Sequence, residues 1–122
     1  MKIIIADDDA VWVRVLSVYL GGSGHEVLSG RTWAETRALA DRDLPDAILL
    51  DSSLADGDAK DFCAVLRADP RFDRTALVLV SGAEPEEGHG ADRCLLKGEP
   101  MGAMVPAILA AAAARRAAGG GK

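Results

Sequence analysis

Short apolar runs alternate with longer, mixed segments along the chain. The strongest runs are Ile3–Ala6, Ala47–Leu50 and Ala76–Val80, and weaker ones occur at Glu26–Ser29 and Arg93–Leu96. In the central runs the apolar residues are consecutive rather than alternating. Consecutive apolar positions are typical of strands that are covered on both faces in a parallel sheet.

The segments between these runs carry helical signals. We expect helices over Val11–Leu20, Trp33–Arg42, Ala59–Ala68 and roughly Met104–Ala118. Asp9 is a plausible N-cap for the first helix, Thr32 with Glu35 forms a capping box for the second, and Asp58 can cap the third. In the alanine-rich last helix Pro106 is acceptable only within the first turn. The pattern therefore predicts repeated βα units, an α/β fold with helices on both faces of a parallel sheet.

Length and composition narrow the class of protein further. The chain has 122 residues, enough for one domain, and its net charge of -5 without a Lys/Arg run argues against nonspecific nucleic-acid binding. It shows no signal peptide and no apolar run of about 18 residues that would span a membrane. Cys63 and Cys94 fit no metal or disulfide framework, so we expect buried free thiols in a reducing cytoplasm.

Polar side chains stand at the carboxyl ends of four predicted strands. They are Asp7 and Asp8, Asp51, Ser81 and Lys97. Because ligands bind at the carboxyl ends of strands in such folds, we expect these side chains to converge on one edge of the sheet. A cluster of carboxylate oxygens suits Mg²⁺ or Mn²⁺ rather than zinc, and an adjacent lysine and hydroxyl suit a phosphoryl group. Each residue alone also has a purely structural interpretation, such as a turn or cap.

As a set, these motifs resemble the receiver domain of two-component response regulators. The resemblance runs from Met1 to about Ala118 and rests on KIIIADDD, GHEV at 24–27, DAILLD followed by SSLADGD, LVLVS, and GADRCLLK at 90–97. It implies a flavodoxin-like, doubly wound domain over residues 1–118 with five parallel strands in the order 2-1-3-4-5. Residues 119–122 would then form a flexible, glycine-rich tail.

The resemblance also implies a metal site. Asp8 and Asp51 would bind Mg²⁺ directly, Asp7 would bind it through water, and the backbone carbonyl of Ser53 would complete the protein ligands. No other cofactor is implied.

The same resemblance implies a phosphorylation switch. Asp51 would accept a phosphoryl group from a histidine kinase or a histidine phosphotransfer protein. Ser81 would bond the phosphoryl oxygen, and Lys97 would pair with Asp51 at rest. Apart from its own phosphorylation and dephosphorylation the protein would not be an enzyme, and as a cytoplasmic single-domain regulator it would signal to a downstream protein by contact, without binding DNA or a membrane.

Four features depart from the family pattern, one of them being Ala55 and Ala59 in place of the proline and glycine that are common after the acceptor. Gly98 follows Lys97 where the family has proline, so we expect a trans peptide bond there. Cys94 replaces the usual aromatic residue. The connection Gly82–Ala91 is too short for a full crossover helix, so we expect the fourth helix to be shortened or missing.

Two other functions compete with the switch. A pseudo-receiver that binds partners without phosphorylation would explain the departures. An aspartate-nucleophile phosphatase would use the acids of Asp7–Val11, but the glycine-threonine continuation and a cap domain are missing.

The first predicted helix is apolar on nearly all sides. It could form a partner or self-association surface with Trp12 or Tyr19 as anchors. Alternatively, the core takes most of this stripe and one aromatic ring lies on the surface.

Overall fold

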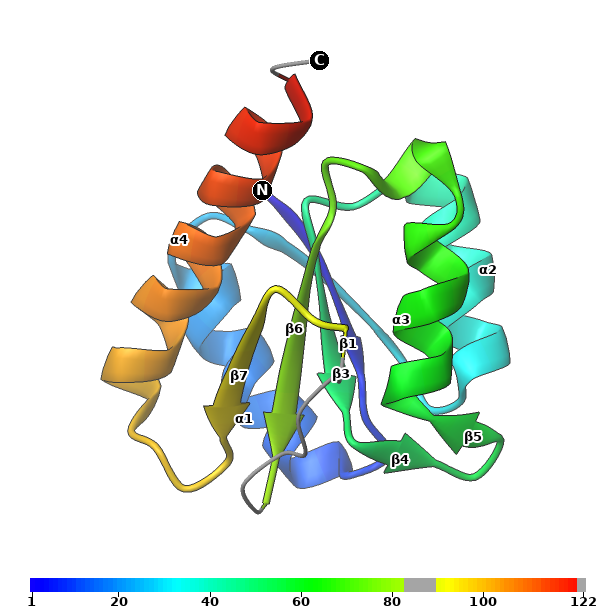
Figure 1. The fold of residues 1–122 in the computed structure, drawn as a ribbon. Helices are drawn as coiled ribbons and strands as arrows, with labels where there is room; N and C mark the ends of the chain where they lie inside the picture. The colour runs from blue at the N-terminus through cyan, green and yellow to red at the C-terminus, as the bar shows by residue number, and fades with distance from the viewer. Residues whose placement is uncertain (83–89, 121–122) are drawn as a thin grey trace.

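Parallel strands form the centre of the computed structural model, which describes residues 1–82 and 90–120 (Figure 1). The main sheet consists of β1 (Lys2–Ala6), β2 (Glu26–Gly30), β3 (Ala47–Asp51), β6 (Ala76–Ser81) and β7 (Arg93–Leu96). Its strand order is β2-β1-β3-β6-β7, and all neighbours are parallel. Counted along the chain within this sheet, the order is 2-1-3-4-5, so the flavodoxin-like prediction is confirmed. β4 (Ser53–Leu54) and β5 (Gly57–Asp58) form a separate antiparallel hairpin.

Helices cover both faces of the sheet. α1 (Ala10–Gly22) and α4 (Met101–Gly120) lie on one side, and α2 (Trp33–Asp43) and α3 (Ala59–Arg67) lie on the other (Figure 1). Successive strand residues point to opposite faces. Ile4 and Ile48 therefore join the core beneath α2 and α3, whereas Ile3 and Ile5 join the core beneath α1 and α4. Both cores need apolar residues, which explains the unbroken apolar runs in the sequence.

The predicted caps of the first two helices are confirmed. The carboxylate of Asp9 accepts a hydrogen bond from the backbone N–H of Trp12 at 3.1 Å. The hydroxyl of Thr32 accepts one from the N–H of Glu35, also at 3.1 Å. These bonds satisfy N–H groups that the first turn of a helix leaves without a partner.

The prediction that the Asp58 side chain caps α3 is wrong. Asp58 occupies the N-cap position, but its side chain makes no capping hydrogen bond. Asp56 instead caps α2, because its two carboxylate oxygens accept from the N–H groups of Trp33 at 2.8 Å and Ala34 at 3.1 Å. This contact joins the β4–β5 hairpin to a helix that lies 22 residues or more earlier in the chain.

The last helix begins earlier and ends later than the predicted Met104–Ala118. α4 starts at Met101, so Pro106 lies beyond its first turn. A proline there removes the hydrogen bond to the carbonyl four residues earlier, that of Gly102. Both residues are exposed, so water can reach the freed carbonyl. Within residues 1–82 and 90–120, no helix has both the length and the apolarity to cross a membrane.

The connection between β6 and β7 runs from Gly82 to Asp92. The expected shortening or loss of the fourth helix falls on residues 83–89, which lie outside the described part of the chain. Flexibility of residues 119–122 stays a prediction, and α4 continues as far as Gly120.

Candidate functional site

Three carboxylates meet at one edge of the sheet. Asp7 and Asp8 directly follow β1, and Asp51 is the last residue of β3. One oxygen from each lies within 4.8 Å of the other two. Asp7 is buried and accepts a hydrogen bond from the backbone N–H of Asp9 at 2.9 Å, whereas Asp8 is exposed and Asp51 is half-buried. The structure therefore brings together the acidic residues that the sequence analysis placed at the strand ends.

Lys97 reaches this cluster from the carboxyl end of β7. Its backbone N–H donates to the carbonyl of Ser81 at 2.9 Å, which fixes the chain beside the acids. The Lys97 Nζ lies 2.8 Å from Asp7 Oδ2 and 3.7 Å from Asp51 Oδ1. The resemblance to receiver domains implied Asp51 as the resting partner of Lys97, but the shorter contact is with Asp7. The Asp7 side chain is only 1% exposed against 16% for Asp51, so it has the greater need of a nearby cation.

Trp12 contacts Lys97, and the sequence did not predict this contact. The Lys97 Nζ lies over the indole ring, 5.1 Å from its centre, in a cation–π contact. The position of Trp12 in the first turn of a helix that starts at the acidic cluster was the available signal. The described residues contain no cis peptide bond, so the Lys97–Gly98 bond is trans as predicted. Trp12 and Asp7, rather than a following proline, hold the lysine in place.

The pKa values of Asp51 and Lys97 are both raised at this site. Burial raises the pKa of Asp51, and the adjacent charge of Asp7 raises it further against the opposing effect of Lys97. Burial acts to lower the pKa of Lys97, but the hydrogen bond and charge of Asp7 outweigh it and the pKa is raised. Lys97 is therefore protonated at neutral pH, and it lies beside the three carboxylates of Asp7, Asp8 and Asp51.

Asp51→Asn is expected to stabilise the metal-free protein at pH 7. Because folding raises the pKa of Asp51, the native state binds this proton more tightly than the unfolded chain does. The contribution of Asp51 to the unfolding free energy therefore falls as pH rises from the ordinary value of 3.8 through the raised native pKa. Thermal unfolding in EDTA should show a higher Tm for Asp51→Asn at pH 7, with the difference closing toward the acid end of this window. Asp61→Asn, at an exposed position on α3, is the control, and a lower Tm for Asp51→Asn would contradict the expectation.

The donor set of the acidic cluster fits a hard divalent cation. Mg²⁺ in octahedral geometry holds oxygen ligands at about 2.1 Å, which places them at most ~4.2 Å apart. The oxygens of Asp7, Asp8 and Asp51 already lie within 4.8 Å of one another. The excess of carboxylates over lysine leaves negative charge for a cation to neutralise. Ser53 lies in β4, two residues after Asp51, and its carbonyl remains a predicted ligand.

The remaining candidate residues lie around this cluster. Ser81 ends β6 and is 8% exposed. Neither cysteine forms a disulfide; Cys63 is buried and Cys94 is half-buried in β7. Burial raises the pKa of the Cys63 thiol to about 11, so this thiol is unreactive at neutral pH.

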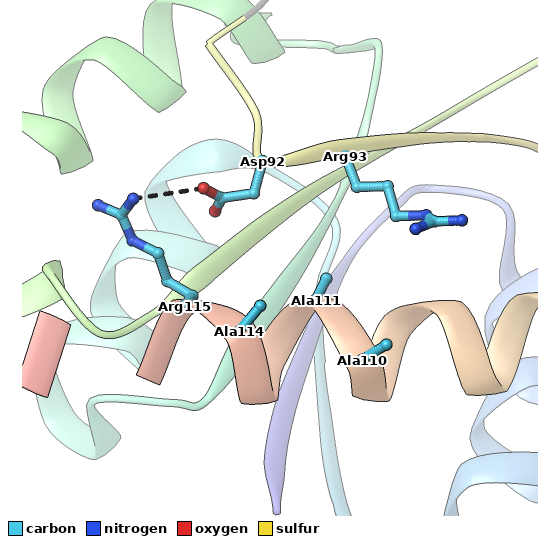
Figure 2. A pocket seen from close by; sticks show the side chains of 6 residues that line it. All are labelled: Asp92, Arg93, Ala110, Ala111, Ala114 and Arg115. Carbon is cyan, nitrogen blue, oxygen red and sulfur yellow. Dashed lines mark hydrogen bonds and ion pairs between the residues drawn. The ribbon is translucent and has the colours of Figure 1, made fainter. Parts of the chain in front are cut away.

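A hollow between β7 and α4 lies outside the site. It has a volume of about 450 Å³ and is lined by Asp92, Arg93, Ala110, Ala111, Ala114 and Arg115 (Figure 2). Asp92 precedes β7, whereas Lys97 follows it, so the hollow lies at the opposite end of that strand from the acidic cluster. Figure 2 shows the Asp92 carboxylate turned toward the Arg115 guanidinium.

Sequence comparison finds response regulators. The chain is 32% identical to the response regulator PleD of Caulobacter vibrioides over 83 residues, which are 68% of this chain and 18% of PleD. It is 30% identical to the protein RcaC of Microchaete diplosiphon over 84 residues, 66% of this chain and 12% of RcaC. The chain thus matches less than a fifth of the length of these curated relatives. No family model matches the sequence.

Structure comparison finds the same fold in solved receiver domains. The BeF3-activated N-terminal receiver domain of Klebsiella pneumoniae RstA superposes with a TM-score of 0.82 at 22% identity, covering 92% of this chain and 98% of that one. The CheY-like receiver domain protein of Methanospirillum hungatei gives a TM-score of 0.81 at 21% identity, covering 93% and 94%. The sequence matches and the shared fold together identify the chain as a response regulator receiver domain.

Proposed function

We propose that this receiver domain is a Mg²⁺-dependent switch that accepts a phosphoryl group on Asp51. The observation that carries the proposal is the position of the Asp51 carboxylate, 3.7 Å from the Lys97 ammonium and inside the cluster with Asp7 and Asp8. Asp51 remains partly accessible to an incoming donor, while Asp7 is enclosed. The donor would be a phosphohistidine on a histidine kinase or a phosphotransfer protein.

The reaction is a nucleophilic displacement at phosphorus. An oxygen of the Asp51 carboxylate forms the new P–O bond as the P–N bond to the donor imidazole breaks, and the imidazole keeps the bonding electron pair. Hydrolysis later releases inorganic phosphate and restores the carboxylate, which resets the switch.

Other residues of the site stabilise the transferred charge. Lys97 lies close enough to Asp51 to pair with a phosphoryl oxygen, and the Ser81 hydroxyl would donate to another. Asp8 and Asp51, with Asp7 nearby and the carbonyl of Ser53, would hold Mg²⁺. When bound, the metal supplies positive charge that favours charge development on the phosphoryl oxygens.

The output of the switch would be contact with another protein. The net charge of -5 gives no support for direct DNA binding. Two cysteines that form no disulfide suit a reducing compartment, and we place the protein in the cytoplasm.

Intact-mass analysis after incubation with acetyl phosphate and Mg²⁺ tests the proposal. A single phosphoryl adduct is expected on the wild-type chain, because acetyl phosphate offers the same transferable group with acetate as the leaving group. The adduct should be absent with EDTA and absent in Asp51→Asn. An adduct that persists in Asp51→Asn would assign the chemistry to another residue and overturn the proposal.

Two observations favour a second function, a pseudo-receiver that binds partners without phosphorylation. Lys97 lies closer to Asp7 than to Asp51, and Gly98 replaces the proline that usually follows this lysine. If this function is correct, no adduct forms under conditions in which another receiver domain is labelled.

A further inference from the structure

The two helical layers of the domain differ sharply in charge. On one side of the sheet, α2 and α3 hold eight charged residues. On the other side, α1 and the segment 101–114 of α4 hold one, Arg14. We call the side formed by α1 and residues 101–114 the neutral layer. Figure 1 shows its two helices adjacent on the same face of the sheet.

The outer side of α1 exposes large apolar side chains. Val11 is 75% exposed, Val18 67%, Tyr19 53% and Val15 41%. Their spacing of three, four and seven residues places them on one stripe of the helix. Leu16 and Leu20 lie in the core and Trp12 packs partly against it. The core thus covers one side of α1 and leaves the valine and tyrosine side chains of the other side exposed. Of the two interpretations drawn from the sequence, the exposed stripe favours the association surface, with Tyr19 rather than Trp12 available as an anchor.

The outer side of α4 adds no charge to this surface. Its exposed positions from 101 to 114 are Gly102, Ala103, Pro106, Ala110, Ala113 and Ala114. Arg115 and Arg116 come later and pair with Asp92 and Asp46. Two adjacent helices of about 13 residues each cover roughly 20 by 20 Å, which is at the low end of a specific interface.

Charge decides what can cover the neutral layer. Each chain carries a net charge of -5, so two copies repel one another through most of their surfaces. The neutral layer carries no carboxylate, and its one charged residue is a cation, so two copies can approach there without apposing their acidic groups. Its lack of carboxylates and its exposed Tyr19 match the composition of interface cores, which are depleted of acidic residues and enriched in aromatic ones. A membrane surface would instead call for several Lys or Arg residues beside the apolar stripe.

We propose that the neutral layer is a homodimer interface, in which the α1 stripe of one copy packs against the same layer of a second copy. Val15 and Val18 lie at the middle of the stripe, with Val11 and Tyr19 at its ends. This association involves neither the acidic cluster nor phosphorylation.

Sedimentation equilibrium of the wild-type chain tests the interface. From about 1 to about 500 μM, the average mass should rise from 12.7 kDa toward twice that value. Val18→Asp places a charge twice in a symmetric interface and should weaken association at least about tenfold. Val65→Asp is the matched control, because Val65 is 54% exposed on α3 and should leave the dissociation constant unchanged. Raising NaCl from about 50 to about 500 mM should tighten the dimer, since salt screens only the repulsion between chains.

Each alternative result overturns the proposal. A wild-type chain that stays monomeric over the whole range leaves the stripe to a different partner. A dimer that Val65→Asp dissociates as strongly as Val18→Asp does lies elsewhere on the surface. Circular dichroism checks that the variants are folded, and Val11→Asp, with 75% exposure in the first turn of α1, is a second variant that should also weaken the dimer.

Discussion

Lys97→Met should destabilise the metal-free protein by about 3 kcal/mol or more at pH 7, because it removes the cation from a buried carboxylate. The Asp7 side chain is 1% exposed, and the Lys97 Nζ lies 2.8 Å from its Oδ2. Methionine keeps an unbranched apolar side chain of nearly the same length but removes the ammonium, and with it both the ion pair with Asp7 and the cation–π contact with Trp12. Urea denaturation in EDTA measures the loss.

The control for this prediction is another lysine. Lys60 is exposed on α3, so Lys60→Met should change the unfolding free energy by no more than about 0.5 kcal/mol. Saturating Mg²⁺ should recover much of the loss in Lys97→Met, since a divalent cation bound by the same acids replaces the missing charge. Folding raises the pKa of Lys97, so the lysine stabilises the fold below its ordinary value of 10.5 and the benefit disappears as pH rises through the native pKa. A loss no larger than that of Lys60→Met would show that Asp7 does not depend on Lys97.

Asp92→Ala should cost about 3 kcal/mol of unfolding free energy, because this carboxylate joins several elements at the opposite end of β7. Its Oδ2 accepts from the Arg67 guanidinium at 2.6 Å and from the backbone N–H of Leu77 at 2.8 Å. Its Oδ1 lies 3.4 Å from Arg115 of α4. Burial lowers the pKa of Arg67, a sign that this cation is partly withdrawn from water and needs its partner.

Two further variants separate charge from hydrogen bonding at this position. Asp92→Asn keeps an acceptor for the N–H of Leu77 and should lose roughly half as much stability. Asp58→Ala removes an aspartate without a side-chain capping bond and should be near neutral. If Asp92→Ala unfolds at the same urea concentration as the wild type, the network around Arg67 contributes nothing to stability.

The sheet and the acidic cluster could be predicted because their signals are local. A strand buried on both faces must be apolar at consecutive positions, as in 47–50 and 76–80, and a parallel sheet delivers the next residues to a shared edge. The caps by Asp9 and Thr32 depend on residues three positions apart. Such distances can be read directly from a sequence.

The contacts that the sequence did not reveal join distant segments. Asp56 caps a helix that begins 23 residues earlier, and the Trp12 ring meets a lysine at the far end of the chain. The preference of Lys97 for Asp7 over Asp51 depends on the relative burial of two carboxylates, which no motif records. α4 begins before the predicted Met104 because the carbonyl that Pro106 leaves without a hydrogen bond belongs to Gly102, which is exposed to water.

One charged network surrounds Asp92 and another surrounds Lys97, at opposite ends of β7. This separation makes their contributions to the free energy of unfolding independent. Asp92 and Lys97 stand on either side of a four-residue strand, about 16 Å apart along the backbone, and among residues 1–82 and 90–120 they share no hydrogen-bond or ion-pair partner. Energetic effects of substitutions at such separations add, so the free energies lost at the two ends should sum within about 0.5 kcal/mol. Both ends of the strand thus stabilise the fold, and the Lys97 end also carries the excess negative charge of the acidic cluster. Because the losses sum, a substitution beside Lys97 leaves the contribution of Asp92 unchanged but lowers the total free energy of unfolding by its own amount.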